Sequence, residues 1–196
     1  MLGSVAHPRN ILAAVVLAVV GIGYGSWAGR AAAVVDGSAQ DKGRAPKVRR
    51  GLAPQLGPYH LDMKTTDLSR LAEFTPSEKA ALGAVIEFKN ERIYHAPPAA
   101  FAGASWEIVL GAVDDRVYKV SALLTLQSRD QRDAQWRNVD AQLRTSLGSP
   151  ASASTVIMTW DTEDGNVVVN RAEGGGAYAL VLTLTSRAVS GFVRIK

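Results

Sequence analysis

The chain has 196 residues, no cysteine and a formal net charge of +4 at pH 7. The first 50 residues carry the whole of this positive excess, and the rest of the chain is close to neutral. The absence of cysteine excludes a disulfide framework and a thiolate site, and the lack of a basic face argues against nucleic-acid binding by the domain.

An uncharged apolar segment occupies residues 11–28. As a helix it would be about 27 Å long, just enough to cross the hydrocarbon core of a bilayer. A short positive region that ends at Arg9 precedes it, and small residues suited to cleavage follow it, as in a secretory signal peptide. The sequence therefore predicts that residues 1–35 are a signal peptide or a single transmembrane anchor, with residues 11–28 as the membrane contact.

Residues 36–56 form a basic linker rich in Gly, Pro and Ala, which is typical of a flexible tether. The excess of basic residues after the apolar segment would place the following domain in the cytoplasm, whereas the signal-like order of the first residues favours export. We expect a single-pass protein of the cytoplasmic membrane with its carboxyl-terminal domain outside. The alternatives are a secreted or periplasmic protein after signal cleavage and a cytoplasm-facing domain.

Residues 57–196 are expected to form one domain, because their number is close to the commonest domain size. It should begin with two short helices. Residues 65–74 place apolar side chains on one face. Thr75 to Glu78 form a capping box with proline at the first helical position, so a second helix should run to Gly83.

Strand-like residues follow the two helices. Residues 85–88 and 93–94 are rich in β-branched and aromatic side chains, and Pro97-Pro98 should end this stretch. Residues 105–124 alternate apolar and polar side chains on either side of Asp114-Asp115, which predicts a β-hairpin with a tight acidic turn.

The strongest helix signal lies over residues 128–147. A capping box begins it at Ser128, and Gly148-Ser149-Pro150 ends it. A second hairpin should follow from residues 155–162 and 167–169, and a last strand from residues 178–185.

The order is thus helix, strand, hairpin and then helix, hairpin, strand. A helix followed by three antiparallel strands occurs twice, in pattern and not in residue identity. Antiparallel strands with one solvated face need cover on the other face. We therefore expect an α+β fold: a two-layer sandwich of an antiparallel sheet with helices on one face, built from tandem helix plus three-strand units and preceded by the N-terminal hydrophobic helix.

Four stretches carry a resemblance to small bacterial envelope domains: GPYHLDMKTTDLSRL (57–71), FAGASWEIVLGAVDDRVYKVSALL (101–124), LGSP (147–150) and MTWDTEDGNVVVN (158–170). The pattern resembles the small lipoprotein of the outer-membrane β-barrel assembly machine and the tandem-repeat β-lactamase inhibitor protein. The resemblance implies a binding module and not an enzyme. The chain departs from both in having neither a lipobox cysteine nor cysteine pairs, and no functional residue is transferred.

The sequence contains no motif for catalysis, a cofactor or a metal. His60 and Asp62 could share a strand face, but no second histidine at ligand spacing accompanies them. The acidic stretch 161–166 lacks the ligand order of a calcium loop and is better interpreted as a hairpin turn. The glycines at 174–176 precede a strand and no Lys-Ser or Lys-Thr, so they form no phosphate loop.

Large aromatic side chains offer the remaining clue. Trp106, Trp136 and Trp160 are expected to meet in the core, one from each hairpin and one from the long helix. If Trp106 or Tyr118 lay on an open sheet face instead, it would mark a contact with a partner.

We expect a non-enzymatic, membrane-tethered or exported binding module of the bacterial cell envelope, whose partner is an envelope protein or another envelope component. A small envelope hydrolase with an unrecognised site is the alternative and would need a deep polar pocket, for example around His60 and His95. A ligand carrier would need an apolar cavity between the layers.

Overall fold

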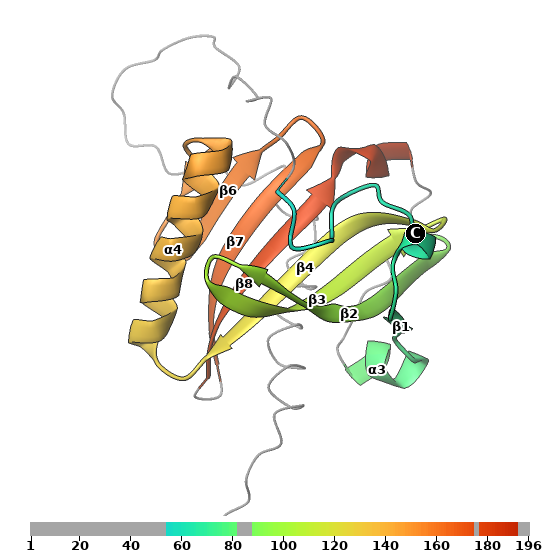
Figure 1. Cartoon of the computed structure of the whole chain (residues 1–196), viewed down its shortest axis with the longest axis horizontal. Coiled ribbons are helices and arrows are strands. Elements are labelled where there is room, and N and C mark those ends of the chain that lie inside the picture. The colour runs from blue at the N-terminus through green and yellow to red at the C-terminus, as the bar shows by residue number, and fades with distance from the viewer. Residues whose placement is uncertain (1–53, 82–87, 175–176, 192–196) are drawn as a thin grey trace, which may run out of the picture.

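The computed structural model describes residues 54–81, 88–174 and 177–191 (Figure 1). The expected N-terminal segment at 1–35, most of the linker at 36–56 and most of the strand at 85–88 lie outside these residues. Within the part that the structure describes, the chain is an α+β protein dominated by one antiparallel sheet. No helix in that part is both long and apolar enough to cross a bilayer.

The sheet has eight strands in the order β1-β2-β3-β4-β8-β7-β6-β5. Their bounds are β1 Ala72–Glu73, β2 Glu91–Phe101, β3 Ala104–Val113, β4 Arg116–Leu126, β5 Ser152–Ala153, β6 Ile157–Asp161, β7 Gly165–Gly174 and β8 Ala177–Ser186. The helices are α3 (Pro76–Ala81) and α4 (Arg129–Leu147), with 3₁₀ turns η1 (Thr65–Asp67) and η2 (Arg187–Gly191). Helix α4 runs along one face of the sheet, and α3 lies beside β1 at its edge (Figure 1).

The long helix confirms the prediction for residues 128–147. Ser128 Oγ accepts a hydrogen bond from the Gln131 amide at 3.2 Å, and Gln131 Oε1 accepts one from the Gln127 amide at 3.0 Å. The first bond satisfies an amide group that the first turn of a helix leaves free, and the second ties the residue before the N-cap to the helix. Gly148 follows the last helical residue with a positive φ of 82°, which glycine adopts without strain. The predicted stripe packs on the sheet through Trp136, Val139, Leu143 and Leu147.

Both predicted hairpins are confirmed. Asp114 and Asp115 have φ angles of 49° and 62°, as a two-residue turn needs in order to follow the twist of its strands. In the β6–β7 turn, the Thr162 amide donates to the Gly165 carbonyl at 2.9 Å. The acidic stretch 161–166 is therefore a hairpin turn, as expected.

The prediction of a helix over residues 65–74 is wrong. Only Thr65–Asp67 form a 3₁₀ turn; the chain then passes through Arg70 at φ 62° and pairs as β1 with the edge of β2. Leu68 and Leu71 pack against the core from this irregular backbone, so tertiary contacts override the helical spacing. The second helix, α3, begins at the predicted capping box, in which the Thr75 amide donates to Glu78 Oε2 at 2.8 Å.

The expected strand end at Pro97-Pro98 is also wrong. Strand β2 continues to Phe101, with a register shift between Ala96 and Ala99. Such a β-bulge accommodates prolines, which lack the amide hydrogen that a regular ladder uses. Among the described residues, β1 is the one strand that pairs with the outer edge of β2. It pairs with Tyr94 and His95 and leaves the prolines without a strand partner on that side.

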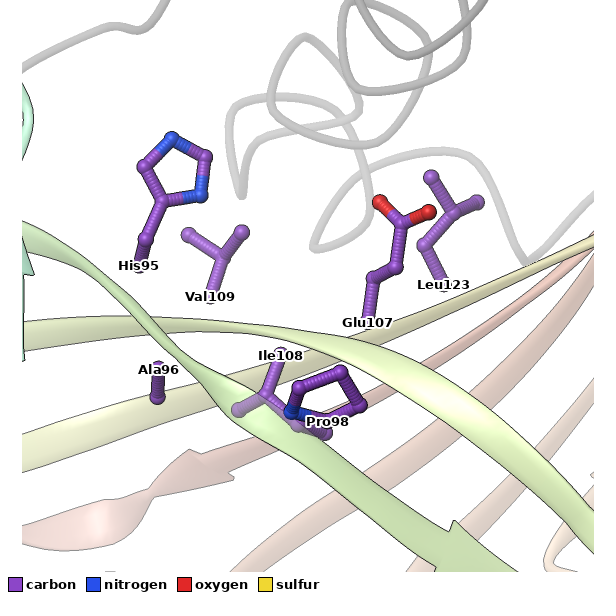
Figure 2. A pocket seen from close by; sticks show the side chains of 7 residues that line it. All are labelled: His95, Ala96, Pro98, Glu107, Ile108, Val109 and Leu123. Carbon is purple, nitrogen blue, oxygen red and sulfur yellow. The ribbon is translucent and has the colours of Figure 1, made fainter. Parts of the chain in front are cut away.

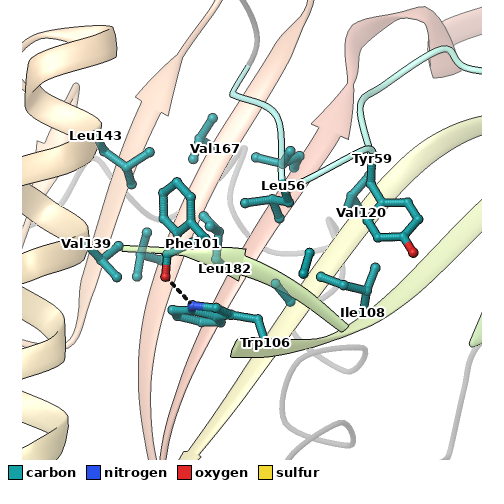
Figure 3. Close-up of a cluster of buried hydrophobic side chains, with 14 of the residues drawn as sticks. Leu56, Tyr59, Phe101, Trp106, Ile108, Val120, Val139, Leu143, Val167 and Leu182 are labelled. Atoms are coloured by element: carbon teal, nitrogen blue, oxygen red, sulfur yellow. Dashed lines mark hydrogen bonds between the residues drawn. The ribbon is translucent and has the colours of Figure 1, made fainter. Parts of the chain in front are cut away.

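The core confirms the prediction for the three tryptophans. Trp106, Trp136 and Trp160 are all buried in one apolar cluster. The Trp106 indole donates to the Phe101 carbonyl at 2.9 Å (Figure 3), which ties together the two strands at the tip of the β2–β3 hairpin. Leu56 and Tyr59 cover the sheet on the same side. Leu56 is fully buried, so the folded domain begins within the segment expected to be linker.

Candidate functional site

The strand register separates two faces of the sheet. A row formed by Ile108, Ala122, Leu182, Val169 and Met158 runs across five strands, and all its members belong to the core beneath α4. Because side chains alternate along a strand, the adjacent rows point away from α4. We call the side that they form the back face.

Two central rows define the back face. One holds, in strand order, His95, Val109, Ser121, Thr183 and Val168; the other holds Glu107, Leu123, Val181 and Asn170. Apart from the histidine, Glu107 is the one ionisable side chain in these rows. Leu123, Val181 and Thr183 in the middle of these rows are buried. The accessible part of the back face lies over β2 and β3, where Glu107 is exposed and His95 and Val109 are half-buried.

A small pocket opens on the back face between β2 and β3 (Figure 2). Its volume is about 110 Å³. The side chains of His95, Val109, Glu107 and Leu123 point to the same side, and Ala96, Ile108 and Pro98 lie nearer the ribbons. In the strand register, two residues of β2, Pro97 and Pro98, lie opposite the single residue Glu107 of β3. The bulge in β2 therefore lies at the pocket.

The size of this pocket limits what it can bind. A dry cavity of about 150 Å³ holds one benzene molecule, whereas pockets for small-molecule ligands measure about 300–1,000 Å³. The pocket, at about 110 Å³, therefore suits one aliphatic side chain. It offers one imidazole and one carboxylate, and it lacks the depth and the set of polar groups that the hydrolase hypothesis requires.

His95 forms a rigid wall of the pocket. Its ring stacks on Phe74 with centroids 3.7 Å apart and planes inclined by 19°. Burial lowers the pKa of His95, although the carboxylates of Glu78 and Glu107 act in the opposite direction. The neutral imidazole is therefore favoured at neutral pH, and Glu107 supplies the negative charge of the site. Within the described part of the chain, Glu107 has no hydrogen bond or ion pair through its side chain.

The two residues expected as partner contacts lie elsewhere. Trp106 is 0% and Tyr118 is 4% exposed. The Tyr118 hydroxyl donates to Glu91 Oε1 at 2.6 Å, and its ring meets Phe88 edge to face. Neither side chain is exposed on an open sheet face, as a partner contact would require.

The other polar candidates are engaged within the domain. His60 Nδ1 lies 2.9 Å from the Leu61 carbonyl, and Asp62 pairs with Arg116 at 3.3 Å. Among the described residues, no group of three or more histidine, aspartate and glutamate side chains is placed to hold a metal ion.

The structure also brings together an ionic cluster that the sequence analysis missed. Arg132 is 7% exposed; it donates to Glu173 at 3.0 Å and to Asp133 at 3.2 Å. Arg171 of β7 pairs with Asp133 at 3.3 Å and lies 4.3 Å above the Trp136 ring. This cluster fastens α4 to β7. A signal existed, since Arg132 precedes Trp136 by four positions and so falls on the apolar stripe of α4.

Comparison with known proteins identifies no relative of this chain. The chain matches no protein-family model, and neither curated proteins nor solved structures show significant similarity to it. The resemblance to small envelope domains therefore stays a prediction.

Proposed function

We propose that the protein is a non-enzymatic binding module of the bacterial cell envelope, tethered or exported through its N-terminal segment. Its binding surface is the part of the back face around the pocket, formed by His95, Pro98, Glu107, Val109 and Leu123. The observation that carries the proposal is a pocket the size of one side chain beside two sheet rows in which Glu107 and His95 are the only ionisable groups. A small apolar pocket with one charged group at its rim suits the recognition of a single side chain.

The topology supports the expected tandem arrangement. Strands β2, β3 and β4 follow α3, and strands β6, β7 and β8 follow α4; the two sets meet where β4 pairs with β8. We propose that these are two helix plus three-strand units, to which the two-residue strands β1 and β5 add the outer edges of the sheet. The resemblance to envelope binding domains applies to this pattern and supplies no partner or residue role.

The location is proposed from the sequence. Residues 11–28 are apolar and uncharged, and a basic linker joins them to the domain. The domain then lies outside the cytoplasmic membrane, either anchored or released. Intact mass measured on separated membrane and soluble fractions, with protease added to cells stripped of their outer layer, tests this. A full-length, protease-resistant product would place the domain in the cytoplasm and refute the envelope assignment.

Site-specific photocrosslinking tests the binding surface. A photoreactive amino acid replaces the half-buried Ser121 on the back face, and a matched chain carries it at Ala141, an exposed position on α4. We expect one discrete adduct from position 121 and none from position 141, identified by mass spectrometry. The adduct should decrease when Glu107→Lys is added, because that change alters the rim of the pocket and leaves the core intact. Equal adducts from both positions, or none from position 121, would refute the proposed surface.

A further inference from the structure

The pocket on the back face defines the chemistry of the partner more narrowly. We infer that it binds one branched aliphatic side chain of a partner protein segment, and that a lysine or arginine next to this side chain pairs with Glu107. The inference rests on the proposed function, because it names the partner of the same surface.

The aliphatic part follows from the size and lining of the pocket. Val109, Leu123 and Pro98 present apolar groups around a volume of about 110 Å³. Leu123 is 6% exposed and gives the pocket a fixed apolar wall. In a cavity of this size and lining, the free energy of binding is most favourable for an aliphatic group, because such a group displaces weakly bound water.

The basic part follows from charge. Glu107 is the one carboxylate in the two central rows of the back face, its side chain is exposed, and no described cation pairs with it. The neighbouring His95 is favoured in its neutral form because burial lowers its pKa. A partner cation therefore meets an uncompensated negative charge, and a partner carboxylate is repelled, which supplies selectivity as well as attraction.

The bulge in β2 indicates how the partner approaches. Segments that add a strand to a sheet need a free row of amide and carbonyl groups at its edge. The outer edge of β2 offers two prolines in its middle, neither of which has an amide hydrogen. The Pro97 carbonyl already accepts from the Tyr59 hydroxyl at 2.9 Å. The partner segment therefore docks on the face of the sheet and not along this edge.

Methyl NMR on the full chain in lipid nanodiscs tests the inference with defined probes. The chain carries ¹³C-labelled leucine and valine methyl groups, and the titrant is N-acetyl-Leu-Lys-amide. Two matched titrants are N-acetyl-Ala-Lys-amide, which lacks the branched side chain, and N-acetyl-Leu-Glu-amide, which reverses the charge. We expect saturable shifts at Val109 and Leu123, and an affinity at least threefold higher for Leu-Lys than for either control.

A Glu107→Lys chain makes the charge argument falsifiable, since an exposed substitution leaves the fold intact. We expect it to prefer Leu-Glu over Leu-Lys. Absence of saturable shifts, or equal binding of all three titrants, would overturn the inference. If position 121 still gives its adduct while the titrants fail, the binding surface stands and its partner chemistry is wrong. If the titrants bind selectively and no adduct forms, the inference about the pocket stands and the proposed binding of an envelope partner through this surface is refuted.

Discussion

The ionic cluster between α4 and β7 yields a quantitative prediction about Arg132. Its side chain is 9% exposed, yet both of its partners keep another arginine when it is removed, since Asp133 retains Arg171 and Glu173 retains Arg129. The cost of Arg132→Met should therefore be about 1–2 kcal/mol, below the roughly 3–5 kcal/mol of a broken buried pair. Methionine keeps most of the packing that the arginine stem provides.

The prediction becomes sharper in a double-mutant cycle with Arg171→Met. Either single change leaves Asp133 with one guanidinium partner, whereas the double change leaves this carboxylate, 33% exposed, with neither. We expect the double variant to lose about 1 kcal/mol more than the sum of the single losses, within the usual range for residues that share a partner.

Urea denaturation of the full chain in mild detergent measures this coupling, with tryptophan fluorescence as the signal because Trp136 lies beneath Arg171. Arg144→Met serves as the control: Arg144 pairs with Asp140 on the exposed side of α4, and the loss should be about 0.3–0.5 kcal/mol and additive with Arg132→Met. Additive losses for Arg132→Met and Arg171→Met would show that Asp133 does not couple them and would refute the argument.

Three further changes test other parts of the structure in the same assay. Gly165→Ala should cost about 1–3 kcal/mol, because its Cβ would overlap the Thr185 carbonyl and lie 2.9 Å from Leu61 Cδ1; Gly174→Ala, with no atom within 4 Å, should be near neutral, and equal effects would contradict the packing at Gly165. Leu182→Ala in central β8 should cost about 3–5 kcal/mol, and a loss below about 1 kcal/mol would count against this core. Since burial lowers the pKa of His95, the unfolded chain binds more protons as the pH falls below about 6.5, so the free energy of unfolding should decrease on acidification. His95→Gln should flatten that slope in unfolding measured across pH, and an unchanged slope would exclude His95 as its source.

Local signals predicted much of the fold. The paired aspartates at 114–115 favour positive φ angles, and the capping boxes at Ser128 and Thr75 begin helices where they predict them. These features depend on a few adjacent residues, so the sequence alone contains the physics that determines them.

The remaining features depend on contacts between distant segments. Residues 65–74 have helical spacing, but β2 offers an edge on which Ala72–Glu73 pair instead. The pocket could not be predicted for a related reason. It exists because Pro97 and Pro98 form a bulge beside Glu107, whereas the sequence predicted that the strand ends at these prolines. His95 was considered as a polar candidate, but its stacking on Phe74 and its nearness to Glu107 arise only from the strand register.

The position of β8 has a consequence for how the chain matures. This strand is synthesised last among the described strands, yet it lies between β4 and β7 and joins the two halves of the sheet. Until it emerges, β4 and β7 each have one unsatisfied edge and the core lacks Leu180, Leu182 and Leu184. A nascent chain therefore cannot complete this sheet before residues 177–186 have been synthesised. On the proposed export route, this late closure of the sheet keeps the polypeptide incompletely folded, and so competent for translocation, while it crosses the membrane.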